Sequence, residues 1–172
     1  MDGAGSGVPA LAYAAVRRRS LDLAAPLSDE DCGAQSMQDA SPVKWHLAHT
    51  SWFFETFILE RFERTFTPFD AAFRVLFNSY YNGIGERHPR AARGLLTRPA
   101  MAEVRAYRAN VDQRIAQLLA ANPEQADLAD LVTLGLQHEQ QHQELMQTDV
   151  LHLLAQHPLL PAYSAAPQGE ST

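Results

Sequence analysis

Two histidines that lie four residues apart, His138 and His142, are the clearest indication of chemistry in this sequence. At about 3.6 residues per turn, residues four apart stand above one another on one helix face, so both imidazoles can reach a single metal ion. A catalytic metal usually needs a third protein ligand and an open coordination position, and in a helical bundle a facing helix can supply that ligand. The candidates for this third ligand are His46 and His49.

The segment that carries His46 and His49 predicts a helix from Ser41 to about Phe62. Ser41-Pro42 is a strong helix start, because a serine hydroxyl accepts from free backbone N–H groups and a proline at the first helical position loses no hydrogen bond. His49 falls on the face of the helix that is otherwise apolar, together with Trp45, Trp52, Phe53 and Leu59. His46 lies about 60° to one side of His49, so it can face the same cavity or its rim.

Histidines spaced by four residues also arise by chance and can simply hydrogen-bond within a core. An inward-facing His49 on another helix favours a metal site, and three neutral imidazoles without cysteine ligands suit Fe(II), Zn or Ni. Glu139 and Glu144 are interpreted as solvated helix charges, which their spacing alone favours. Asp149 falls near the wheel angle of His138 but is not required as a ligand.

The remaining periodicity predicts three further main helices and no strand-like alternation. The first has its apolar spacing in Leu11, Ala15, Leu21 and Leu23, with Arg17 to Arg19 between them. This first helix is expected from Pro9 to about Ala25. The second begins at Thr97-Arg98-Pro99, with threonine as the cap, and ends at about Ala121. The third is expected from Gln125 or Leu128 to Ala155. A short capped turn is expected at residues 28–31. Four helices with one long crossover predict an all-α antiparallel four-helix bundle over residues 9–160, with a flexible lead at 1–8 and a flexible tail at 161–172.

The crossover, between the second and third main helices, is a long loop from Thr65 to Pro99. It mixes turn residues with aromatic residues, including Tyr80 and Tyr81, and it carries Arg87, Arg90 and Arg93 as a small basic cluster. Loops of this length inside a compact bundle are more often functional than not.

Composition excludes several classes of protein. At 172 residues and 46% hydrophobic residues, the chain fits one compact domain with a sizeable core. Cys32 is the only cysteine, so no internal disulfide forms; together with the lack of a secretory signal pattern, this favours a reducing cytoplasm. No apolar run approaches the roughly 20 residues of a membrane span. The net charge of -6 argues against a nucleic-acid binder.

Two segments together resemble a known family: residues 41–55, SPVKWHLAHTSWFFE, and residues 138–144, HEQQHQE. They are similar to the N-terminal DinB-like domain of the ergothioneine-biosynthesis sulfoxide synthases, which are EgtB-like non-haem iron enzymes. The resemblance implies that His49, His138 and His142 are the iron ligands and that His46 is not. It also implies that Gln141 contacts the trimethylated histidine substrate, hercynine.

The run from His88 to Arg93 is similar to the family segment whose two arginines hold the carboxylates of the thiol substrate, γ-glutamylcysteine or cysteine. The resemblance therefore implies that Arg90 and Arg93 bind this thiol, and guanidinium groups do bind carboxylates through paired hydrogen bonds. Without the resemblance, both arginines would be interpreted as parts of a solvated loop.

The implied activity is O2-dependent formation of a C–S bond between hercynine and the thiol, with Fe(II) as cofactor. Family members continue into a second domain like the formylglycine-generating enzyme, which supplies a catalytic tyrosine. We expect that this domain is absent here, so that the chain is a shortened product or a subunit with a separately encoded partner, and that it is incomplete alone. Two alternatives stay open: a free-standing DinB-like thiol transferase or hydrolase with zinc or nickel, and a non-catalytic metal-binding subunit. The identity of the thiol donor also stays open, as does the question of whether the pathway leads to selenoneine or ovothiol instead of ergothioneine.

Overall fold

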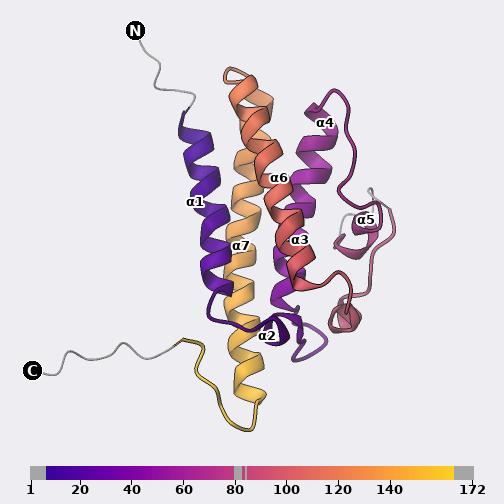
Figure 1. The fold of residues 1–172 in the computed structure, drawn as a ribbon, viewed down its shortest axis with the longest axis vertical. Helices are drawn as coiled ribbons and strands as arrows, with labels where there is room; N and C mark the ends of the chain where they lie inside the picture. The colour runs from indigo at the N-terminus through magenta and orange to yellow at the C-terminus, as the bar shows by residue number, and fades with distance from the viewer. Residues whose placement is uncertain (1–6, 80–82, 84, 165–172) are drawn as a thin grey trace, which may run out of the picture.

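The computed structural model describes residues 7–79, 83 and 85–164, and every regular element in these ranges is a helix (Figure 1). The elements are α1 (Gly7–Ala24), α2 (Asp29–Gly33), α3 (Val43–Phe54), η1 (Glu55–Leu59, a π-helix), α4 (Glu60–Phe62), α5 (Phe73–Leu76), η3 (Arg90–Leu95, a 3₁₀-helix), α6 (Met101–Ala121) and α7 (Ala126–Gln156). The segment from α3 through η1 to α4 is one continuous helix that ends at Phe62, as predicted. The predicted all-α bundle of four long helices is confirmed.

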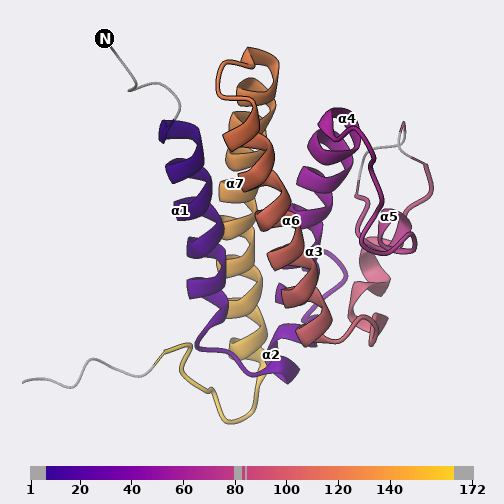
Figure 2. The same cartoon turned by 45° about the horizontal axis from the view of Figure 1, so that its top comes forward.

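Helix direction follows from the two kinds of connection. In Figures 1 and 2, α1 and α7 run one way along the bundle, whereas α3 and α6 run the other way. The short turn between α6 and α7 makes that pair antiparallel, and the long crossover brings α6 back parallel to α3. The pairs α1–α7, α3–α6 and α3–α7 make the main helix contacts. The face shared by α3 and α7 carries all three histidines of the expected ligand set.

The helix starts differ in part from the sequence prediction. Ser28 caps α2 as expected, because its side chain accepts from the Asp31 N–H. Ser41 does not cap α3: the helix begins at Val43, and the Ser41 hydroxyl instead accepts a hydrogen bond from an arginine of the crossover. Thr97 is also not a cap, since α6 begins four residues later, at Met101.

The buried face of α1 matches the predicted apolar positions only at Leu23, which is 6% exposed. Leu11 is 74% exposed and Ala15 is exposed, whereas Tyr13, Arg17 and Ser20 are buried. The prediction set Arg17 to Arg19 between the apolar positions, and an unpaired charge is costly to bury. Arg17 is buried nevertheless, because it pairs with Asp112 on α6 and with a carboxylate on α7.

That carboxylate is Glu139, which the sequence interpretation placed wrongly in solvent; its residue is 0% exposed. Arg17 donates from Nη1 to Glu139 Oε2 over 3.0 Å, Ser20 Oγ donates to Oε1 over 2.5 Å, and Arg108 Nη2 donates to Oε1. Burial raises the pKa of this carboxyl, but the charges of Arg17 and Arg108 outweigh burial and lower the pKa to about 2. The network therefore joins α1, α6 and α7 through a charged glutamate next to His138.

Helices α3 and α7 approach closely where Gly135 faces Phe54. A Cβ atom at position 135 would lie 2.6 Å from a ring carbon of Phe54, so only glycine fits there without a shift. Phe54 is 0% exposed and its ring meets Tyr13 edge-on, so it has little room to move. The next turns of α7 carry His138 and His142, which this approach brings within reach of α3.

The crossover folds back onto the bundle through buried aromatic residues. Phe73 and Phe77 pack in the core, and η3 lies near the start of α6. Tyr80 and Tyr81 lie outside the described residues, as do most of the predicted lead and residues 165–172 of the predicted tail. Within the described part of that tail, the Tyr163 hydroxyl donates to the carbonyl of Leu23 over 2.5 Å.

Candidate metal centre

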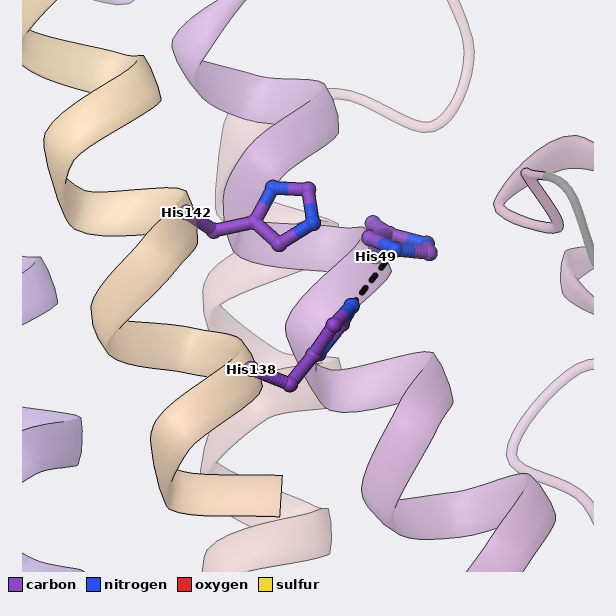
Figure 3. A group of neighbouring side chains, drawn as sticks. All are labelled: His49, His138 and His142. Carbon is purple, nitrogen blue, oxygen red and sulfur yellow. Dashed lines mark hydrogen bonds between the residues drawn. The ribbon is translucent and has the colours of Figure 1, made fainter. Parts of the chain in front are cut away.

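Three histidines from two helices converge on one point (Figure 3). His138 and His142 project from successive turns of α7, and His49 projects toward them from α3. The Nε2 atoms of His49 and His138 lie 3.2 Å apart, and one ring nitrogen from each of the three residues lies within 4.8 Å of the other two. The sequence predicted this grouping, and the structure brings the three side chains together.

Aromatic residues hold His49 rigidly. Its Nδ1–H donates to the carbonyl of Phe77 over 2.6 Å, which leaves Nε2 unprotonated and directed at His138. The imidazole stacks between Trp45, at a centroid distance of 4.5 Å, and Trp52, at 5.4 Å. Trp45, His49 and Trp52 share one face of α3, as the helical spacing predicted.

The helical wheel left His46 open, and the structure gives it a different environment. His46 lines the same cavity, but it is not a member of the group of three. Its Nδ1 lies 2.9 Å from His142 Nδ1, and its Nε2 lies 3.0 Å from Asp149 Oδ2. The backbone N–H of Ser41 donates to the same Asp149 oxygen over 2.8 Å.

The group of three fits a transition-metal ion. Two nitrogens bound to one ion at about 2.1 Å lie roughly 3.0–3.4 Å apart, and the 3.2 Å between His49 and His138 falls in this range. Within the described residues, His138 Nδ1 is buried without a hydrogen-bond partner, while its Nε2 faces His49 and its ring stacks on Phe53 at a centroid distance of 4.4 Å. Imidazole donors without thiolate suit iron, zinc or nickel. The three-histidine group can therefore hold a metal ion.

A cavity of about 340 Å³ opens beside the three histidines. Its lining comes from the residue before Pro42, from α3 and α7, and from the crossover with η3, and it includes every side chain that was predicted to bind a ligand. The lining residues are Ser41, Trp45, His46, His49, Ser79, Arg90, Arg93, His138, Gln141, His142 and Leu145. Ser79, at the end of a crossover segment without periodicity, gave no signal in the sequence. Trp45 was predicted only as a core residue.

Arg93 is the buried cation of this cavity, at 5% exposure. Its guanidinium carbon lies 3.3 Å from the centre of the Trp45 ring, and Nη1 donates to Ser41 Oγ over 2.8 Å. Arg90 enters half-buried from the same 3₁₀-helix, and its carbonyl accepts from Gln35 Nε2 over 2.9 Å. Two guanidinium groups thus line a cavity that also contains the histidines.

A family model described as the DinB superfamily matches residues 12–146, which is most of the chain. The chain belongs to the DinB superfamily. The match begins within α1 and ends within α7 just past His142, so this DinB domain includes all three histidines of the group. A search of the curated proteins found no matching relative. None of the helices in the described ranges has the length and hydropathy that crossing a membrane requires.

Burial shifts the pH range in which this DinB domain is expected to lose metal. Below about pH 6.5, the pKa of an ordinary histidine, protons compete with a metal ion for the imidazole nitrogen. Burial lowers the pKa of His138 to about 4 and holds the pKa of His49 and of His142 well below the usual value, with neighbouring histidines adding to the effect at the last two. We expect metal affinity to stay nearly constant from pH 7.5 to about pH 5 and to fall as pH approaches 4. Anaerobic competition titrations with a chromophoric chelator measure this, and a decline that begins at pH 6.5 would contradict it.

Proposed function

We propose that this DinB domain binds one Fe(II) through His49, His138 and His142. We further propose that it takes part in O2-dependent C–S bond formation between hercynine and a cysteine-type thiol. The observation that carries the proposal is that one cavity contains both the three imidazoles and two guanidinium groups, Arg90 and Arg93. A site for metal alone has no need of two arginines, whereas a thiol substrate that carries carboxylates does.

Arg93 is suited to hold such a carboxylate in a fixed place. Its stacking on Trp45 and its bond to Ser41 restrict the side chain, so less conformational entropy is lost when a ligand binds. Trp45 also stacks on His49, so the guanidinium and the proposed iron ligand are positioned by the same indole ring. This support favours a thiol held at a defined distance from the metal.

Gln141 is exposed at the mouth of the cavity, one residue before His142. A side-chain amide there can donate and accept hydrogen bonds, which suits the imidazole ring of hercynine. In the proposed reaction a ring C–H bond and the S–H bond break, and a C–S bond and an S–O bond form. The second oxygen atom leaves as water, so a four-electron oxidation of the substrates matches the four-electron reduction of O2.

Bound Fe(II) would supply a redox-active centre with open coordination positions. The chain's own residues would fix the two substrates next to it and shield one side of the site with Trp45 and Leu145. We also propose a partner domain like the formylglycine-generating enzyme, which would cover the exposed mouth at Gln141 and exclude water.

The function is tested with chain loaded anaerobically with Fe(II) and then given hercynine, γ-glutamylcysteine or cysteine, and O2. Mass spectrometry measures the sulfoxide. We expect little product from residues 1–172 alone and a large increase when a formylglycine-generating-enzyme-like domain from a sulfoxide synthase is added. Cysteamine, a thiol without a carboxylate, is the matched control substrate and should give far less product.

The outcomes separate the candidate functions. Robust turnover by the chain alone overturns the partner proposal and leaves the reaction in place. No sulfoxide with the partner present, despite bound iron, overturns the sulfoxide-synthase function. Zinc or nickel in the purified chain, with no exchange for iron, would favour the thiol transferase or hydrolase that the DinB fold also accommodates.

A further inference from the structure

We infer that Asp149 and His46 form a hydrogen-bonded relay that fixes the tautomer of His142, so that His142 Nε2 carries the lone pair offered to the metal. The inference rests on the proposed metal site. Asp149 Oδ2 lies 3.0 Å from His46 Nε2, and His46 Nδ1 lies 2.9 Å from His142 Nδ1. The three side chains therefore form an unbroken chain of contacts, in which His46 bridges from α3 to two residues of α7.

The direction of each hydrogen bond follows from what each group can do. An ionised carboxylate only accepts, so the proton between Asp149 and His46 belongs to His46 Nε2. His46 is 2% exposed, and a buried imidazole is favoured in its neutral form, with one proton. Its Nδ1 is then an acceptor, and His142 Nδ1 must be the donor. The single proton of His142 is thereby placed on Nδ1, which leaves Nε2 free to ligate.

Asp149 is itself held in place for this role. The backbone N–H of Ser41 donates to the oxygen that faces His46, so the carboxylate is oriented by the residues just before α3. The tautomer of His49 is fixed in the same way, because its Nδ1–H donates to the Phe77 carbonyl and its Nε2 is left unprotonated. His46 and Asp149 are thus positioning residues, and their loss is expected to lower metal affinity about 10- to 100-fold.

The direct test is NMR of metal-free protein labelled with ¹⁵N-histidine, because long-range ¹H–¹⁵N couplings identify the protonated ring nitrogen. We expect wild-type His142 to be protonated on Nδ1. A His142 ring protonated on Nε2 would overturn the relay. This measurement needs neither metal nor activity: the Nδ1 tautomer in a protein that binds no metal would support the relay and reject the metal site.

Variants at His46 separate the relay from simple packing. His46→Phe fills the site but removes both ring nitrogens, so His142 should lose its Nδ1 tautomer and metal affinity should fall about 10- to 100-fold. His46→Gln retains one acceptor and one donor and should restore the tautomer and most of the affinity. His157→Ala, at an exposed position after α7, is the control and should change neither. Equal affinity in the Phe and Gln variants, both folded, would overturn the proposal.

Discussion

Replacing His138 and His142 together by alanine is expected to abolish metal binding. Each of these side chains supplies one of the three nitrogens that converge in the cavity. In the double variant only His49, on α3, remains of the group of three. The loss should exceed the roughly 100-fold effect of residues that only support a ligand. Anaerobic titration with Fe(II), with the metal content checked by mass spectrometry, measures the stoichiometry and the affinity.

The same titration distinguishes the two histidines of α3, because loss of His49 should abolish tight binding whereas loss of His46 should lower the affinity only about 10- to 100-fold. His49→Ala should be as damaging as loss of an α7 ligand, since His49 Nε2 lies 3.2 Å from His138 Nε2. The matched control is His157→Ala on the same chain, which should bind metal like the wild type. Unchanged stoichiometry and affinity in the His138→Ala, His142→Ala protein would reject the metal centre outright.

Replacing Glu139 by alanine is expected to destabilise the fold by about 3–5 kcal/mol, the usual cost of removing one partner from a buried ion pair. Arg17 and Arg108, at 2% and 1% exposure, would lose the carboxylate that both of them contact. Urea unfolding followed by circular dichroism measures the change in free energy. Glu144→Ala, at an exposed position on the same helix, is the control and should stay within about 0.5 kcal/mol.

Acid adds a second test of the same network. The pKa of Glu139 is about 2 in the fold, below its ordinary value of about 4.3 in an unfolded chain. Its contribution to stability is therefore fully present above about pH 4.3 and declines as pH falls toward 2. The difference in unfolding free energy between wild type and Glu139→Ala should narrow over that interval. A difference that is small at pH 7 would show that Glu139 is not the charged centre of the network.

Much of the site could be predicted because helix geometry is local. The four-residue spacing of His138 and His142 and the apolar face around His49 place all three rings once both segments are helical. The helical bundle was predicted from the helical spacing of the apolar residues and from the absence of the apolar–polar alternation that is typical of strands. The metal itself, its identity and the reaction stay predictions, since spacing says which groups meet and nothing about what they bind.

The remaining features depend on distant partners. Arg17 and Glu139 are buried because they pair with each other and with further charged partners on α6, and no pattern within one helix indicates such pairs. Ser41 does not cap α3 because its hydroxyl accepts a hydrogen bond from Arg93 and its backbone N–H donates to Asp149, and both partners lie in other segments. For the same reason the connection from Asp149 through His46 to His142 was not predicted, although all three residues were considered.

Because tryptophans stack on His49, the intrinsic fluorescence of the protein can report on ligand binding at this histidine. The chain has two tryptophans, Trp45 and Trp52, and both lie against this one imidazole. All of the indole emission therefore originates beside the proposed metal ligand, with no distant tryptophan to dilute the signal. A paramagnetic ion bound at His49 would quench that emission, and a guest that displaced Arg93 from Trp45 would alter it separately. Metal ions and substrate candidates can thus be screened with unlabelled protein by tryptophan fluorescence.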